Sequence, residues 1–193
     1  MKFEKLDICI SDADILVKLC LTGHLGILGK VFKQVIIVKT VEEEAKRKLG
    51  RKIKGISISE AQSQGWLKII SVNDSNILEK EQIMNIEVFK RSYDCYLHPG
   101  ELESAALANE LGINLFLCDD RDAKKIIERE TDIRGLAHWE VLTIGIMMKV
   151  ISFEEAEKIF NDINSTRTHP IKYSFRELYK KAIKRIKDLK LFM

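Results

Sequence analysis

The chain has 193 residues, of which 46% are hydrophobic and 32% charged, with only two prolines and ten glycines. This length suits one domain, and the composition excludes a disordered, collagen-like or low-complexity chain. The net charge of +3 is unevenly distributed, because residues 167–193 carry nine Lys and Arg against two acidic residues. A basic tail of charge +7 therefore follows an acidic body of charge −4.

Short runs of β-forming residues alternate along the chain with runs of helical periodicity. The expected elements are a strand at 6–10, a helix at 13–22, a strand at 34–38, a helix at 40–49, a short helix at 59–65, a strand at 66–72, helices at 77–91 and 101–111, a strand at 114–118, a helix at 121–130, a strand at 133–136, and helices at 139–149, 153–163 and 173–189. Thr40 is the expected N-cap of its helix, and Gly112 the C-cap of the helix that precedes it.

This alternation of strands and helices predicts an α/β fold, with a central parallel sheet of about five strands flanked by helices. We expect the α/β domain to occupy residues 1–150 and a basic, helical C-terminal extension to occupy residues 151–193.

The chain has no apolar stretch that approaches the roughly 20 residues of a membrane-spanning helix. Its first seven residues contain four charged side chains, where a signal peptide needs an apolar run. The four cysteines lie far apart and lack the paired spacing of a zinc site. We therefore expect a cytoplasmic protein with reduced thiols and no membrane association.

Acidic residues occur where the predicted strands end and the following helices begin. Four separate segments supply them: Asp12, Glu44, the pair Glu101 and Glu103, and the pair Asp119 and Asp120. In open parallel sheets, ligands bind beyond the carboxyl ends of the strands. The sequence therefore predicts that these carboxylates meet at one edge of the sheet.

Taken singly, each of these acids is more often a helix cap than a catalytic group. Several carboxylates in one pocket repel one another unless a cation lies between them. Hard oxygen ligands at an open edge suit Mg²⁺ or Mn²⁺, which also bind phosphate oxygens. This combination is typical of metal-dependent phosphodiester cleavage, in which cations activate water and stabilise the leaving oxygen.

Four stretches of the sequence resemble the PIN-domain ribonuclease family, in particular its small prokaryotic members with a helical C-terminal extension. The stretches are ICISDADIL (8–16), VKTVEEE (38–44), GELESAALA (100–108) and LCDDRDA (117–123). They follow the order of the family's motifs, and the segment after residue 135 is similar to the extension of that subgroup.

The resemblance implies a PIN-like nuclease domain that hydrolyses single-stranded RNA with Mg²⁺ or Mn²⁺. It assigns catalytic and metal-ligand roles to Asp12, Glu44, Asp120 and one of the Glu101/Glu103 pair, with Asp119 as a further candidate ligand. We favour Glu101 because it directly follows Gly100, although the choice between the two glutamates stays open at this point.

Cleavage of a polyanion also requires cations outside an acidic pocket. Candidate RNA-binding residues are Lys46 and Arg47 in the cluster 46–48, Arg121 after the acidic pair, and Lys180 and Lys184 on the last helix. The alternatives are a solvated helix face for the lysines, and an ion pair with Asp119 or Asp122 for Arg121.

Three functions remain open on the sequence. The first is a metal-dependent endoribonuclease, and the second is a catalytically weak module that binds nucleic acid or an antitoxin-like protein. The third is a phosphatase of the haloacid-dehalogenase type, since Asp12-Ala13-Asp14 after a strand resembles its nucleophile motif. That reading leaves Glu44 and Glu101 unexplained. Expected partners are single-stranded RNA, an antitoxin-like protein and a second copy of the chain, since the family resemblance also implies toxin-like members and dimers.

Overall fold

The computed structural model describes residues 5–50 and 52–191. Within them, five parallel strands form one sheet in the order β3-β2-β1-β4-β5. The strands are β1 Leu6–Ser11, β2 Phe32–Val38, β3 Leu67–Ile70, β4 Leu115–Leu117 and β5 Arg134–Leu136. At the centre of the sheet, Ile10 of β1 is in register with Ile36 of β2 on one side and Phe116 of β4 on the other. The predicted α/β fold with a five-stranded parallel sheet is confirmed.

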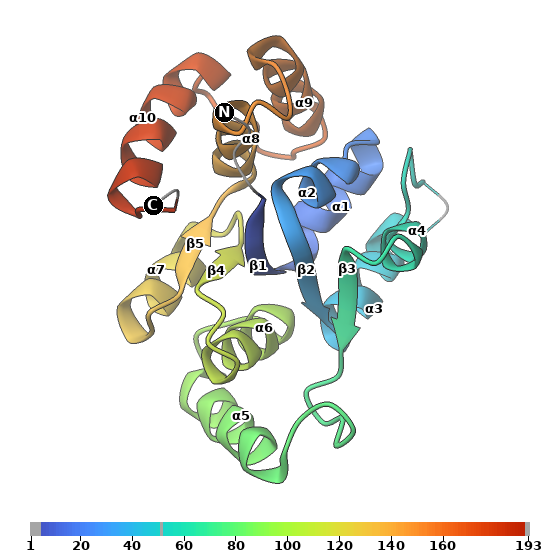
Figure 1. Ribbon diagram of the computed structural model, residues 1–193, viewed down its shortest axis with the longest axis vertical. Coiled ribbons are helices and arrows are strands. Elements are labelled where there is room, and N and C mark those ends of the chain that lie inside the picture. The colour runs from blue at the N-terminus through green and yellow to red at the C-terminus, as the bar shows by residue number, and fades with distance from the viewer. Residues whose placement is uncertain (1–4, 51, 192–193) are drawn as a thin grey trace.

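The helices of the described residues connect and cover these strands. They are α1 Ala13–Thr22, α2 Gly26–Val31, α3 Lys39–Leu49, α4 Ile58–Ser63, α5 Lys80–Tyr93, α6 Pro99–Glu110, α7 Arg121–Glu130, α8 His138–Met147, α9 Phe153–Ser165 and α10 Phe175–Asp188. Figure 1 shows α8, α9 and α10 together at one end of the molecule and α5 and α6 at the opposite end. The predicted order of elements is confirmed, except that α2 was not expected.

Local hydrogen bonds explain where several helices begin. Asp12 caps α1 by accepting a hydrogen bond from the Ile15 backbone N–H, and Asp120 caps α7 in the same manner. Helix α10 begins with a capping box, in which Ser174 and Glu177 each bond the other's backbone N–H. Such caps satisfy N–H groups that have no partner within the helix.

The predicted N-cap of α3 is wrong, whereas Gly112 closes α6 as expected. Helix α3 begins one residue earlier than expected, with Val38 as its N-cap. Thr40 therefore lies inside the helix, and its hydroxyl donates a hydrogen bond to Glu103 instead of capping a backbone N–H. Helix α6 ends at Glu110 with Leu111 as its C-cap, and Gly112 follows with a φ of 64°. A positive φ of this kind favours glycine, and Gly112 thus ends the helix from the position directly after the C-cap.

The C-terminal helices share the core of the α/β layers. Phe160 of α9 and Phe175 of α10 are fully buried, and their ring centroids lie 5.6 Å apart. Arg185 of α10 donates hydrogen bonds to Glu140 at 2.5 Å and to the Gly135 carbonyl at 2.8 Å, and it also pairs with Glu128. Apolar burial contributes roughly 1.5–3 kcal/mol for each large side chain. Helices α9 and α10 therefore pack against each other, and Arg185 also ties α10 to α7, α8 and β5.

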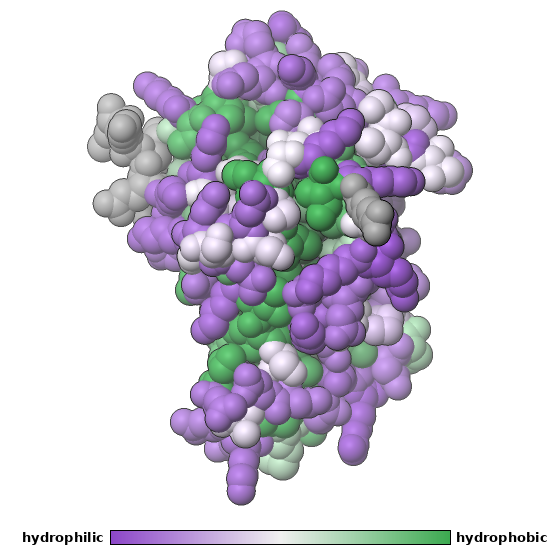
Figure 2. All heavy atoms as spheres, turned by 90° about the vertical axis from the view of Figure 1, so that its right-hand side faces the viewer, coloured by the Kyte–Doolittle hydropathy of each residue, from purple (hydrophilic) through white to green (hydrophobic). Residues whose placement is uncertain are grey.

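The face of the molecule that Figure 2 presents is largely hydrophilic. Figure 2 shows polar residues over most of one face, with hydrophobic residues reaching the surface in a narrow band between them. Among the helices that the structure describes, none has the length and apolar character needed to cross a membrane.

Candidate active site

The carboxyl ends of β1 and β4 bring two of the predicted acids together. The Asp12 backbone N–H donates a hydrogen bond to the Leu117 carbonyl at 2.9 Å, which continues the β1–β4 pairing by one residue. Beyond this point lies a pocket of about 310 Å³. Its lining residues are Asp12, Ala13, Asp14, Glu44, Lys48, His98, Gly100, Glu101 and Asp120. Four acids predicted from four separate segments thus border one pocket.

Asp12 is the most deeply buried of these acids, with 4% of its surface exposed. Its Oδ1 accepts a hydrogen bond from the Ile15 backbone N–H at 2.9 Å. Burial raises the pKa of Asp12 to about 7, the Ile15 hydrogen bond opposes this rise, and the nearby charge of Asp119 adds to it. No Lys, Arg or His of the described residues lies within ion-pairing distance of Asp12. The carboxylate therefore lacks the cation that would stabilise its charge.

The two glutamates at the start of α6 point to different surroundings. Glu101 lines the pocket, and its Oε2 accepts a hydrogen bond from the His98 backbone N–H at 3.2 Å. Burial raises the pKa of Glu101. Glu103 instead accepts the hydrogen bond of Thr40 and lies 3.6 Å from the ammonium of Lys90. The structure therefore brings Glu101, and not Glu103, into the pocket.

Asp120 and Glu44 complete the acidic lining. The Oδ1 of Asp120 accepts hydrogen bonds from the backbone N–H groups of Asp122 at 2.7 Å and Ala123 at 2.8 Å. These bonds fix the orientation of the carboxylate. Glu44 reaches the pocket from α3 and lies beside Gly100, which has no side chain. A Cβ at position 100 would lie 3.3 Å from the Glu44 Oε2.

Asp119 does not line the pocket, although the sequence had made it a candidate ligand. Its Oδ2 accepts hydrogen bonds from Lys18 at 2.6 Å and Arg167 at 3.1 Å. The ring Nδ1 of His138 lies 2.8 Å from Oδ1. Burial alone would raise the pKa of Asp119, but His138 and Lys18 hold it well below its usual range. Both oxygens thus serve a buried network that joins β4 to α1, α8 and the loop before α10.

Sequence analysis missed the three partners of Asp119. Lys18 and Arg167 are separated from Asp119 by 101 and 48 residues, and His138 by 19. No local spacing marks contacts over such distances. The only sequence signal is that each partner is basic, which does not distinguish it from the other Lys, Arg and His residues.

The acids of the pocket fit a divalent cation. Asp12, Glu101 and Cys118 each present a potential ligand atom, and these atoms lie within 4.8 Å of one another. Burial, together with the charges of Asp12 and Glu101, raises the pKa of the Cys118 thiol, so this group stays neutral. Mg²⁺ and Mn²⁺ prefer the hard carboxylate oxygens. Asp12 and Glu101, with Asp120 beside them, are therefore the residues that would hold such an ion.

The predicted RNA-binding cations lie outside the lining of this pocket. Lys46 forms an ion pair with Glu42 at 2.5 Å, whereas Arg47, Lys180 and Lys184 are exposed. Arg121 is exposed at the first turn of α7. Within the described residues, Arg121 forms no ion pair with either expected partner. Asp119 pairs instead with Lys18, His138 and Arg167, and Asp122 pairs with Lys125.

Lys48 differs from its neighbours in the 46–48 cluster, which the sequence placed outside the acidic pocket. It lines the pocket, with its ammonium 2.7 Å from Glu44 Oε1. The reason is helical geometry: Glu44 and Lys48 are four residues apart and lie on the same face of α3.

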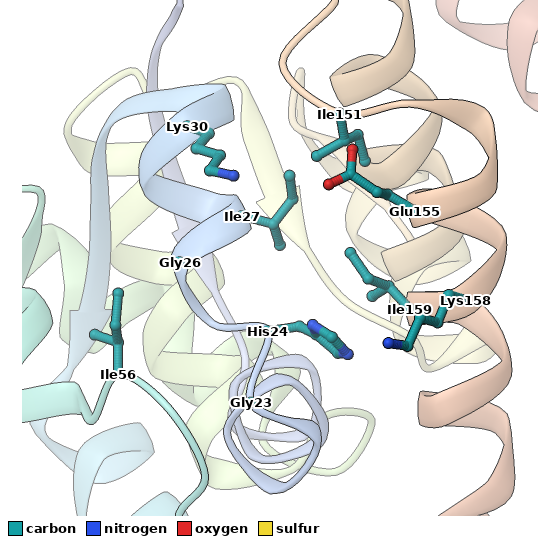
Figure 3. Close-up of a pocket in the computed structure, with 10 residues that line it drawn as sticks. All are labelled: Gly23, His24, Gly26, Ile27, Lys30, Ile56, Ile151, Glu155, Lys158 and Ile159. Carbon is teal, nitrogen blue, oxygen red and sulfur yellow. The ribbon is translucent and has the colours of Figure 1, made fainter.

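A second pocket, of about 360 Å³, lies between the α1–α2 segment and α9 (Figure 3). Isoleucines form its apolar walls, and the side chains of His24 and Lys158 extend towards each other within it. His24 also bonds the carboxylate of Asp162 at 2.9 Å. Glu155 is the one carboxylate among its lining residues, and none of the predicted site residues borders it.

The fold and the pocket define an α/β protein with a carboxylate cluster at the carboxyl edge of a parallel sheet, suited to a divalent cation. A family model described as a PIN domain matches residues 8–188. The chain therefore belongs to the PIN-domain family, whose fold is that of a nuclease, and the predicted family is confirmed. None of the curated proteins matches the chain.

Proposed function

We propose that the protein is a metal-dependent endoribonuclease that hydrolyses the phosphodiester bonds of single-stranded RNA. The observation that carries this proposal is the convergence of Asp12, Glu44, Glu101 and Asp120 on one pocket of about 310 Å³. Membership of the PIN-domain family supports the nuclease chemistry. It also weakens the phosphatase alternative, which leaves Glu44 and Glu101 without a role.

Asp12, Glu101 and Asp120 would hold Mg²⁺ or Mn²⁺, and Glu44 borders the same space. When bound, such an ion activates a water molecule and stabilises negative charge on the phosphate. The protein's own contribution is to orient the carboxylates. The Ile15 N–H fixes Asp12, and the N–H groups of Asp122 and Ala123 fix Asp120. Fixed ligands avoid the cost of reorganisation during the reaction.

Substrate binding requires positive charge around the acidic pocket. Arg121 is exposed one residue after Asp120, so we assign it a phosphate next to the cleaved bond. Lys46 and Arg47 lie on the helix that carries Glu44, and Lys180 and Lys184 lie on α10. In our proposal, these lysines and Arg47 contact phosphates farther along the strand. An antitoxin-like partner, a homodimer and a cytoplasmic location remain parts of the proposal.

The test is incubation of the purified chain with a fluorescently labelled single-stranded RNA and Mn²⁺. Asp12→Asn and Glu101→Gln should each lower the cleavage rate by about 100-fold or more, the scale of losing one preorganised electrostatic group. Glu103→Gln is the matched control, because it changes the same residue type on the same helix outside the pocket. Its rate should stay close to that of the wild type.

Equal cleavage by wild type and Asp12→Asn would overturn the proposed site. Parallel reactions with double-stranded RNA and single-stranded DNA test the substrate class. Faster cleavage of either one than of single-stranded RNA would overturn that part of the proposal.

A further inference from the structure

Lys48 is a cation built into the acidic pocket. Its ammonium lies 2.7 Å from Asp14 Oδ1 and 2.7 Å from Glu44 Oε1, so it bridges a residue of α1 and a residue of α3. The side chain of Lys48 is 39% exposed, and those of Asp14 and Glu44 are 53% and 29% exposed. The three groups therefore meet at the rim of the pocket, on the side of α1 and α3.

Lys48 divides the carboxylates of the pocket into two sets. Asp14 and Glu44 share its ammonium, and Asp14 also lies 3.8 Å from Lys18. Asp12, Glu101 and Asp120 form no ion pair with a basic side chain of the described residues. One set is thus already paired with cations of the protein itself. The other retains negative charge that a bound cation would neutralise.

We propose that Lys48 takes the position of a second cation, so that the pocket binds one divalent ion and not two. The ion lies at Asp12, Glu101 and Asp120, while the ammonium of Lys48 holds Asp14 and Glu44. This inference rests on the metal site of the proposed function and specifies its stoichiometry. Lys48 is a positioning residue in this arrangement, because it acts by holding the Glu44 carboxylate in place.

The physical basis is competition for the same oxygens. A divalent ion bound at Asp14 and Glu44 would have to displace the ammonium, since both bind the carboxylate oxygens at close range. Removal of the ammonium leaves two neighbouring carboxylates with Lys18, 3.8 Å from Asp14, as their one remaining ion-pair partner among the described residues. Such a pair repels and favours the entry of a cation. A variant without the Lys48 charge should therefore gain an ion site that the wild type lacks.

The test is the count of Mn²⁺ ions bound to the purified chain, by isothermal titration calorimetry and by electron paramagnetic resonance of the free ion. Wild type should bind one ion per chain, and Lys48→Met should bind two. Lys46→Met is the matched control, because Lys46 lies on the same helix but pairs with Glu42 outside the pocket. It should bind one ion. Lys48→Met combined with Glu44→Gln should return the count to one, and circular dichroism verifies that each variant is folded.

Two ions bound by wild type, or one ion bound by folded Lys48→Met, would overturn the inference and leave the proposed nuclease intact. If Lys48→Met fails to fold, Lys48→Gln provides the same count with a polar side chain of nearly equal length. Binding of no ion by wild type would overturn both proposals. One ion in wild type and two in Lys48→Met, without RNA cleavage by wild type, would support the inference and overturn the proposed function alone.

Discussion

Replacing Asp12 by Asn should make the metal-free protein more stable, although it removes a candidate catalytic group. Burial raises the pKa of Asp12 from 3.8 to about 7, so the native state retains a proton that the unfolded chain loses near pH 4. The free energy of unfolding therefore falls as the pH rises from about 4 to about 7, and it changes no further from this cause above that range.

The difference between the two pKa values sets the size of the effect. At about 1.4 kcal/mol per pH unit, Asp12 costs the native state up to about 4 kcal/mol at pH 8, where it is ionised, and about 2 kcal/mol at pH 5, where it keeps its proton. Asn cannot ionise, and its amide oxygen can still accept the Ile15 hydrogen bond. The variant should thus gain up to about 4 kcal/mol at pH 8 and only about half as much at pH 5.

The assay is urea unfolding of wild type and Asp12→Asn at pH 5 and pH 8, in the presence of EDTA. Asp7→Asn is the control, because the side chain of Asp7 is 81% exposed and lies outside the pocket. Saturating Mn²⁺ should reduce the gain at pH 8, because the ion stabilises the wild type and not Asp12→Asn. At a free Mn²⁺ concentration of 100 times the dissociation constant, this stabilisation is about 2.7 kcal/mol. A less stable variant at pH 8, or an equal gain at both pH values, would refute the reasoning.

Three further substitutions test the surroundings of the pocket. Asp119→Asn should lower the free energy of unfolding by about 3 kcal/mol or more at pH 7, because it leaves buried basic partners without their carboxylate. The loss should shrink below about pH 4, because the unfolded chain then protonates Asp119 and the ionised carboxylate stabilises the native state of the wild type less. Equal losses at pH 7 and pH 3 would contradict this account. Arg185→Ala should lower the free energy of unfolding in urea by about 2–3 kcal/mol, because it leaves the buried carboxylate of Glu140 without its partner. The unfolding curve should keep a single transition. Two separate transitions would show that α10 is an independent unit. Gly100→Ala should leave the Mn²⁺ affinity close to that of the wild type in calorimetry, because the groups that its Cβ would crowd are Val41 and Glu44, and neither holds the ion in this account; a clearly weaker affinity would show that Glu44 is a metal ligand.

The fold was predictable because it depends on local patterns. Alternating runs of strand and helix periodicity fix the order of the elements, and a parallel sheet then brings strand ends to one edge. That rule alone places Asp12 beside Asp120, as the hydrogen bond from Asp12 to Leu117 illustrates. Helix α2 escaped prediction because its six residues, GILGKV, include two glycines and show no full helical period.

The detailed assignment of the acids was less predictable. Asp119 and Asp120 are adjacent in sequence, yet one is held by Lys18, His138 and Arg167 and the other lines the pocket. This difference depends on contacts between segments far apart in the chain, which no local pattern records. Sequence reasoning also misjudged Lys48, although the four-residue spacing from Glu44 was visible and predicts a pair on one helix face.

The most direct test of the central claim is anomalous X-ray diffraction from crystals of the wild-type protein soaked in Mn²⁺. The account predicts one strong peak per chain in the pocket, bounded by the carboxylates of Asp12, Glu101 and Asp120, and no such peak in Asp12→Asn. A pocket without an anomalous peak at saturating Mn²⁺, or a peak that persists in Asp12→Asn, would contradict it.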